Sequence, residues 1–120
     1  MSIVNVKVQN IRPAFLNLKD WCSDSNNIYI GRKGIVFIDN KRYPTYDSIW
    51  FNPFKIGKDG NRNEVIQKYE VYIRDRLKNG LFLKDELRLL KNKNLGCWCA
   101  PELCHGNVLL KILQEENVVE

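Results

Sequence analysis

The order of apolar and polar residues along the chain predicts strands that alternate with helices. Val4, Val6 and Val8 alternate with polar neighbours, which is the two-residue period of a strand with one buried face. Short apolar runs at 28–30 and 95–99 indicate two further buried strands, the first of them central in its sheet. Because both runs end at polar segments, we expect them to be neighbours or near-neighbours in one sheet.

Apolar residues recur with the helical period in three other segments. The first segment starts at Asn63, a suitable helix cap, and stops at Gly80, where a left-handed residue would end the helix. The second is short and rich in leucine, and the third runs from Gly106 to Gln114. The positions that we expect to be buried in the second and third helices are Leu83, Leu87, Leu90, Val108, Leu109, Ile112 and Leu113.

An insertion at about 33–50 separates the second strand from the first of these helices. Its β-branched run at 35–38, the turn pair Asp39 and Asn40, and the polar residues 41–43 predict a hairpin.

Strands in alternation with helical segments predict an α/β fold. We expect one small Rossmann-like domain over residues 1–120, with a mainly parallel sheet flanked by helices and the hairpin inserted into it. A chain of 120 residues suits one domain. Ligands of such folds gather outside the carboxyl ends of the strands, so we expect a pocket where the two apolar runs end.

Composition narrows the class of protein. Apolar residues make up 44% and charged residues 28% of the chain, as in ordinary globular proteins and unlike disordered or fibrous ones. No apolar run reaches the roughly 18 residues of a membrane span, and the first residues lack a signal-peptide pattern. We therefore expect no membrane partner and a cytoplasmic location, where cysteines stay reduced.

The net charge of +5 comes from 19 Lys and Arg against 14 Asp and Glu, and it favours anionic ligands. The cations are mixed with acids and form no dense tract, which supports a solvated surface more than a nucleic-acid footprint. An anionic small molecule is therefore the partner that we expect, and a nucleic acid is the weaker alternative.

Three of the four cysteines and the only histidine lie within residues 97–105. Cys97, Cys99, Cys104 and His105 match the ligand types and the ligand number of a tetrahedral zinc site. On a strand Cys97 and Cys99 point to the same face, whereas the side chains of the neighbours Cys104 and His105 diverge on a helix. The pattern requires no cofactor, zinc is a candidate, and the structural alternative makes Cys97 and Cys99 small buried fillers.

Cys104 is expected at or just before the first turn of the last helix. Backbone N–H groups and the helix dipole favour negative charge there, which lowers the pKa of a thiol or holds a phosphate. Cys104 is thus a candidate nucleophile, and His105 is a candidate general acid or base, although it is badly placed to take a proton from its neighbour. The structural alternative for His105 is a helix cap.

Arg32 directly follows a predicted buried strand, where a guanidinium can clamp a phosphate or a carboxylate. We expect it to act on a ligand more than on the fold, and the alternative is a salt bridge to Asp47 or Asp59. The amide of Asn52 could read the edge of a base or a sugar, or could start a turn with Pro53.

Three separated blocks run from Tyr29 to Arg32, from Asn52 to Ile66 and from Gly96 to Gly106. Together they resemble a small phage and bacterial family known only as domain of unknown function 4326, over about residues 28–113. Because no activity is established for that family, the resemblance implies one shared site and no reaction. Its residues would be Tyr29, Gly31, Arg32, Asn52, Pro53, Cys97, Cys99, Cys104, His105 and Gly106.

The chain departs from that family between the first two blocks. Members pass from the arginine to the asparagine in a few residues and carry glycine just before the asparagine. Here the connection from Arg32 to Asn52 is about twenty residues long, and Phe51 replaces the glycine. We expect the insertion to lid or narrow the pocket.

Three functions agree with these features, and the sequence leaves open whether the protein is an enzyme. The leading hypothesis is that it binds or processes a nucleotide-like or other phosphorylated small molecule, gripped by Arg32 and by the helix start at Cys104 and Gly106. The second is a zinc-stabilised module that binds nucleic acid or a protein partner. The third is a thiol enzyme that uses Cys104.

Overall fold

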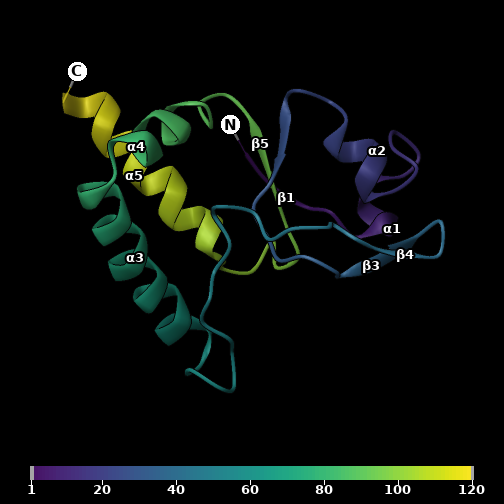
Figure 1. Ribbon diagram of the computed structural model, residues 1–120, viewed down its shortest axis with the longest axis horizontal. Coiled ribbons are helices and arrows are strands. Elements are labelled where there is room, and N and C mark those ends of the chain that lie inside the picture. The colour runs from purple at the N-terminus through teal and green to yellow at the C-terminus, as the bar shows by residue number, and fades with distance from the viewer. Residues whose placement is uncertain (1, 120) are drawn as a thin grey trace.

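The computed structural model describes residues 2–119, which form five helices and five strands in the order drawn in Figure 1. The elements are β1 (Ser2–Asn5), α1 (Val8–Ile11), α2 (Leu18–Cys22), β2 (Asn27–Tyr29), β3 (Val36–Ile38), β4 (Lys41–Tyr43), α3 (Arg62–Asn79), α4 (Leu81–Arg88), β5 (Asn94–Cys97) and α5 (His105–Val119). Within this part of the chain, no helix is long and apolar enough to cross a membrane.

Three strands form a small parallel sheet in the order β1-β5-β2. Leu95 of β5 lies between Ile3 and Ile28 in the register, and the N–H of Ile30 extends the pairing with a 3.0 Å hydrogen bond to the carbonyl of Gly96. The predicted adjacency of the two apolar runs is confirmed. The prediction of a central strand at 28–30 is wrong, because β5 takes the middle and β2 is an edge strand.

The first strand is shorter than its alternating valines predict. Val6 is buried, but β1 ends at Asn5, and Val8 begins α1 with more than a third of its surface exposed. The side chain of Asn5 accounts for the early end. Its oxygen accepts the N–H of Lys7, and its amide donates to the carbonyl of Ala100 at 2.8 Å, so the backbone turns there.

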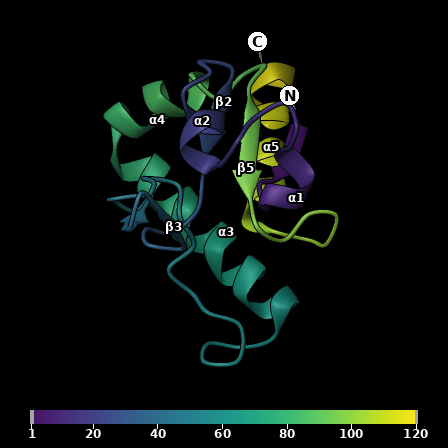
Figure 2. The same ribbon diagram turned by 90° about the vertical axis from the view of Figure 1, so that its right-hand side faces the viewer.

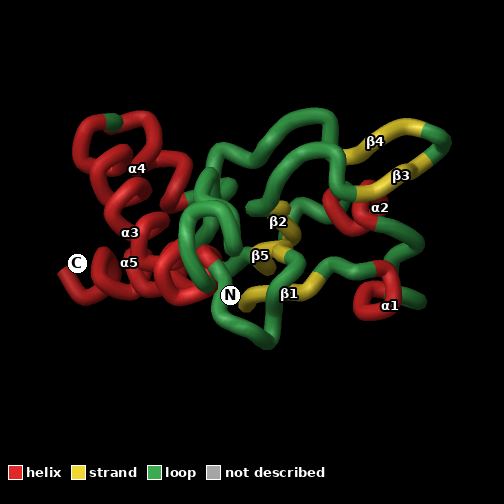
Figure 3. The backbone as a smooth tube through the Cα atoms, turned by 90° about the horizontal axis from the view of Figure 1, so that it is seen from below, coloured by secondary structure: helices red, strands yellow, loops and turns green. Residues whose placement is uncertain are grey.

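The two faces of the sheet carry different layers (Figures 2 and 3). On one face, alternate strand residues such as Leu95 pack against Tyr69 and Ile73 of α3 and Leu109 of α5. On the other face, Trp21 of α2 lies over Gly96, where an added Cβ would approach its ring to 2.6 Å. The chain is therefore a small α/β structure with a parallel sheet between helices, as the coarse prediction states.

The inserted hairpin is present as predicted. Strands β3 and β4 pair antiparallel, and Asp39 and Asn40 both have positive φ, as a two-residue turn of this hand requires. Val36 of β3 and Tyr43 of β4 pack into the same cluster as Trp21. The hairpin thus extends the second layer.

The helices α3, α4 and α5 bury the predicted residues, but α3 begins and ends differently from the prediction. All the leucine, valine and isoleucine positions expected to be buried in α4, α5 and the turn after α4 are buried. The cap of α3 is Asn61 instead of Asn63, because the side chains of Asn61 and Glu64 each accept the backbone N–H of the other. Gly80 joins α3 to α4 with φ near −136°, so it is not the left-handed stop that the sequence predicted.

Candidate functional site

A cavity of about 530 Å³ lies where β2 and β5 end and α3 and α5 begin. Its wall is completed by the segment that leads into α3. The lining residues are Gly31, Arg32, Ile35, Asn52, Phe54, Lys55, Ile56, Arg62, Val65, Ile66, Cys97, Trp98, Cys99, Leu103, Cys104 and His105. The pocket predicted between the ends of the two apolar runs is therefore present.

Seven of the ten residues expected at one site line this cavity, and Tyr29, Pro53 and Gly106 do not. Tyr29 supports the wall from behind. Its hydroxyl donates to the carbonyl of Arg32 at 2.7 Å and accepts the indole N–H of Trp98 at 2.8 Å. Burial raises the pKa of Tyr29 to about 12, so the hydroxyl keeps its proton. An added Cβ on Gly31 would collide with this hydroxyl.

Gly106 has a packing role in the first turn of α5. An added Cβ would lie 2.7 Å from the Cδ1 atom of Ile3 and 2.9 Å from that of Ile30, both on the sheet. The absence of a side chain lets α5 start directly against the sheet. This close approach brings the two residues before Gly106 to the cavity.

The segment at Asn52 is fixed by its own polar atoms. The side-chain oxygen of Asn52 accepts the N–H of Phe54 at 2.9 Å, which closes a turn around Pro53, and its amide donates to the carbonyl of Val65 at 3.4 Å. Asn52 is buried. The turn that the sequence analysis gave as the alternative is thus formed, and the side chain contacts protein on both sides.

Arg32 anchors the same segment. Its Nε and Nη2 donate to the carbonyl of Asn52 at 3.1 and 2.6 Å, and Nη2 also donates to the carbonyl of Phe54 at 3.0 Å. The alternative, a salt bridge of Arg32 to Asp47 or Asp59, does not form, since Asp47 accepts the N–H of Lys33 and Asp59 that of Lys55. Among residues 2–119, the remaining nitrogen, Nη1, has no hydrogen-bond partner, so Arg32 both holds the wall and lines the cavity with a free donor.

Two sulfur atoms lie in contact at the base of the cavity. The Sγ atoms of Cys97 and Cys104 are 3.4 Å apart, and Cys104 also accepts the N–H of Gly106 at 3.3 Å. The S–H of Cys104, followed by the N–H groups of Cys99 and Ala100, lowers the pKa of Cys97 to about 6, while burial opposes this. Donating that hydrogen bond raises the pKa of Cys104.

This arrangement corrects two sequence-based expectations. Strand β5 ends at Cys97, so Cys99 lies beyond the strand and the partner of Cys97 is Cys104. Cys104 does stand at the start of α5, where Asn107 accepts its N–H at 2.9 Å. Its sulfur, however, accepts the N–H of Gly106 itself, and the lowered pKa belongs to Cys97. Cys104 at the helix start therefore stays a thiol, and its S–H stabilises a thiolate at Cys97.

His105 turns away from these sulfurs. Its Nε2 lies 2.7 Å from the carbonyl of Ile30, and because a carbonyl only accepts, Nε2 carries the hydrogen. The ring stands edge-on to Tyr69, with 4.9 Å between ring centroids. Burial first, and then the charge of Arg32, lower the pKa of His105 to about 4, so the imidazole is neutral at pH 7.

The four candidate zinc ligands do not lie together in this structure. Among the described residues, no three His, Cys, Asp or Glu side chains are grouped to hold a metal ion. His105 bonds the sheet, and Cys99 contacts Arg62, whose pKa it raises. Cys97 and Cys104 supply two adjacent soft donors.

The charge of the cavity wall was only partly foreseen. Arg32, Lys55 and Arg62 line it, and none of the lining residues that the structure describes carries a carboxylate. Arg62 begins α3, donates to the carbonyl of Leu103 at 3.0 Å and pairs with the exposed Glu102 at 2.9 Å. Arg62 and Lys55 both lie in the second resemblance block, which was the available signal for them. Neither was named as a site residue in the sequence analysis.

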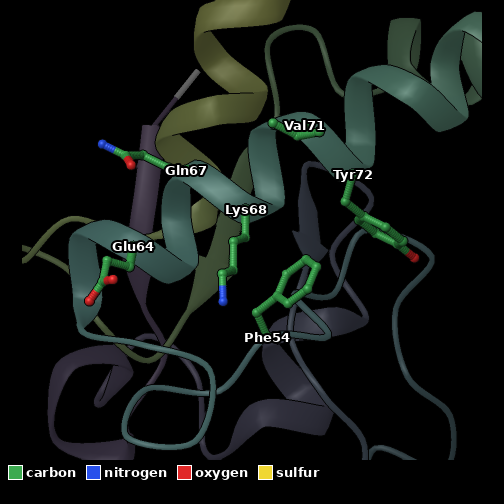
Figure 4. Close-up of a pocket in the computed structure, with 6 residues that line it drawn as sticks. All are labelled: Phe54, Glu64, Gln67, Lys68, Val71 and Tyr72. Atoms are coloured by element: carbon green, nitrogen blue, oxygen red, sulfur yellow. The ribbon is translucent and has the colours of Figure 1, made fainter.

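A second hollow of about 450 Å³ lies on the other side of Phe54, which lines both. Figure 4 shows it between Phe54 and α3, with Glu64, Gln67, Lys68, Val71 and Tyr72 along the helix. Its charged groups are already used, because Glu64 caps α3 and Lys68 donates to the carbonyl of Asp59 at 2.6 Å. The first cavity is the better candidate site.

Comparison with known proteins gives relatives without a described activity. The chain is 33% identical over 94 residues to "Uncharacterized protein R718" of Acanthamoeba polyphaga mimivirus, covering 72% of this chain and 65% of that protein. It is 36% identical over 59 residues to the "Uncharacterized 12.4 kDa protein in nrdA-td intergenic region" of Enterobacteria phage T4, covering 48% of this chain and 55% of that protein. The chain thus spans less than two thirds of either relative.

No solved structure matches the chain at a significant level. The family model described as "Domain of unknown function (DUF4326)" matches residues 16–115, which include every residue of the cavity and of the sulfur pair. Since this match covers most of the chain, the protein belongs to the DUF4326 family.

Proposed function

We propose that this protein binds a nucleotide-like or other phosphorylated small molecule in the cavity at the ends of β2 and β5. The observation that carries the proposal is the charge of the wall. Arg32, Lys55 and Arg62 line a cavity whose described lining has no carboxylate, and the one carboxylate paired with these cations is that of the exposed Glu102 with Arg62. A concave site lined by positive charges without negative ones attracts anions, and guanidinium groups suit phosphate oxygens in particular.

The rest of the wall fits an organic group attached to the phosphate. Ile35, Phe54 and Trp98 are among the apolar residues that line the cavity. Its volume of about 530 Å³ lies within the roughly 300–1,000 Å³ of small-molecule sites. A flat ring on the apolar part and a phosphate near the cations would use both halves of the wall, in the manner of a Rossmann-like domain that binds at the carboxyl ends of its strands. We place this activity in the cytoplasm of a bacterium or a virus-infected host cell.

Thiol catalysis is a second proposal, and the contact between Cys97 and Cys104 favours it. The nucleophile would be Cys97 instead of Cys104, because Cys97 accepts the S–H of Cys104 and has the lowered pKa. A ligand phosphate would then be held above the sulfur by the cations. Alkylation of Cys97 at pH 7, measured by mass spectrometry against Cys22, tests this reactivity.

The zinc-stabilised module has less support as a proposal. A structural zinc site takes four ligands, and in this structure only Cys97 and Cys104 of the four candidates lie together. Elemental analysis of the purified protein tests the module, since it requires about one zinc per chain that a chelator removes with loss of folding.

Calorimetric titration with nucleosides and with their mono- and diphosphates tests the leading proposal. We expect the phosphorylated compounds to bind and the affinity to rise from nucleoside to diphosphate. Two results would overturn the proposal. One is equal affinity for a nucleoside and its diphosphate, and the other is that neither these compounds nor inorganic pyrophosphate bind. Native mass spectrometry of the freshly purified protein adds the identity of any retained ligand.

A further inference from the structure

Cys97 and Cys104 are arranged as a pair. Cys97 ends β5 and Cys104 directly precedes α5, so the close packing of α5 on the sheet at Gly106 brings their sulfurs to 3.4 Å. A disulfide bond is about 2.0 Å long, so the sulfurs need to approach by only about 1.4 Å, which side-chain rotation can provide. Cys97 and Cys99 are too close in sequence for this geometry, and Cys22 lies in the cluster on the opposite face of the sheet.

The surroundings of the pair stabilise a thiolate. The N–H of Gly106 is 3.3 Å from the sulfur of Cys104, whose S–H in turn donates to the sulfur of Cys97 at 3.4 Å. Arg62 adds a positive charge on the same cavity wall. A cysteine that only fills space in a core needs none of these donors. The thiolate is also the form that attacks oxidants and disulfides.

Only a small oxidant can reach the two sulfur atoms. Cys97 and Cys104 are only 2% and 1% exposed, yet both line the cavity. A molecule that enters the cavity can therefore reach the sulfurs, whereas the disulfide of another folded protein cannot. Small hydroperoxides, of which hydrogen peroxide is the simplest, meet this condition.

We propose that Cys97 and Cys104 form a redox-active dithiol that a small hydroperoxide converts into an intramolecular disulfide. The Cys97 thiolate attacks one peroxide oxygen, so an S–O bond forms, the O–O bond breaks, and the departing hydroxide takes a proton from solvent to become water. The sulfur of Cys104 then attacks the resulting sulfenic acid. The S–S bond forms, the S–O bond breaks, and the second hydroxide leaves as water with the proton of Cys104. The two sulfurs lose two electrons in total and the peroxide gains them.

Peptide mapping of the oxidised protein tests the proposal directly. The full chain is treated with hydrogen peroxide at pH 7 in the presence of a chelator, free thiols are alkylated, and the protein is cut after glutamate. Glu102 lies between the two cysteines, so cleavage there separates the peptide of Cys97 from that of Cys104 unless a disulfide joins them. We expect two of the four thiols to be lost, the chain to lose the mass of two hydrogen atoms, and these two peptides to be linked until dithiothreitol is added.

Variants assign the roles within the pair. Cys99→Ser is the matched control and should still lose two thiols. Cys104→Ser keeps a side chain that accepts the N–H of Gly106 and should stop at a sulfenic acid on Cys97, which dimedone captures. Four free thiols after treatment, a link through Cys99 or Cys22, or an equally fast reaction in urea would each overturn the proposal. Cys97 and Cys99 share the peptide 87–102, so fragmentation of that peptide locates the alkyl group, which we expect on Cys99. This mapping of the unsubstituted protein decides between the two cysteines even where a variant fails to fold.

Discussion

The guanidinium of Arg32 donates two hydrogen bonds to the backbone carbonyl of Asn52, at 3.1 and 2.6 Å across a separation of twenty residues. The loop between them contains the inserted hairpin, so this contact closes the insertion at its base. It also fixes the segment that forms one wall of the cavity. Arg32 therefore has a structural role as well as the ligand-binding role that we propose.

Replacing Arg32 by Ala should lower the free energy of unfolding by about 1–3 kcal/mol, because the partly buried carbonyls of Asn52 and Phe54 lose a charged hydrogen-bond donor. This loss is larger than the sequence analysis implies, since Arg32 was expected there to act on a ligand more than on the fold. Urea denaturation measures the effect. Lys41→Ala is the control, since Lys41 is exposed and its loss should change stability by no more than about 0.5 kcal/mol. Equal effects of the two substitutions would contradict the structural role.

Replacing Gly106 by Ala should destabilise the protein by about 1–3 kcal/mol, although alanine is the better helix former by about 1 kcal/mol. The reason is the added methyl group, which would meet the Cδ1 atom of Ile3 at 2.7 Å. A double-mutant cycle tests this, with chemical denaturation of the unsubstituted protein, Gly106→Ala, Ile3→Val and the double variant. Because Ile3→Val removes that Cδ1 atom, the double variant should be less destabilised than the sum of the single ones. Strict additivity would show that the clash is absorbed elsewhere.

Stability should fall between pH 6.5 and pH 4 through His105. Burial lowers the pKa of His105 to about 4 in the folded chain from 6.5 in the unfolded chain. In that window the unfolded state binds more protons, so stability decreases as pH decreases, by up to about 3 kcal/mol. Denaturation midpoints across this range, compared with those of His105→Gln, measure the contribution.

Subtracting the variant separates His105 from other groups. The carboxylates of Glu70 and Glu115, whose pKa values Arg74 lowers, titrate in both proteins and cancel in the difference. Parallel curves for the two proteins between pH 6.5 and pH 4 would mean that His105 is exposed enough to be protonated in the folded state.

The predictable parts of the fold are those that side-chain type encodes locally. The turn pair Asp39 and Asn40 identified the hairpin, and the leucines of α4 identified its buried face. Apolar runs at 28–30 and 95–99 predicted adjacent strands. Their order in the sheet was not predictable, because either run is apolar enough to be the central strand. Which of them is central depends on which one pairs with β1.

The parts of the site that sequence reasoning missed depend on backbone groups. Arg32 bonds to the carbonyls of Asn52 and Phe54, and every residue type presents a carbonyl. The contact of Cys97 with Cys104 follows from where β5 ends and how closely α5 packs on the sheet. The predicted strand ran two residues further than β5 and so placed Cys97 and Cys99 on one face. The spacing of the cysteines in the sequence identified the residues of the site but did not predict which sulfur atoms are in contact.

Lys55 should contribute to the binding of a phosphorylated ligand without contributing to the fold. It lines the cavity, and its hydrogen bond to Asp59 comes from its backbone N–H, so Lys55→Gln leaves that bond intact. We expect this substitution to weaken the binding of ADP, used as a probe, by about tenfold, which corresponds to about 1.4 kcal/mol, and to leave adenosine unaffected. Lys41→Gln on β4, which removes the same charge outside the cavity lining, is the control for the net charge of the chain. Calorimetry on both variants separates a local contact from long-range attraction. Equal weakening by the two substitutions would mean that the whole surface attracts the anion and that the cavity does not hold its phosphate.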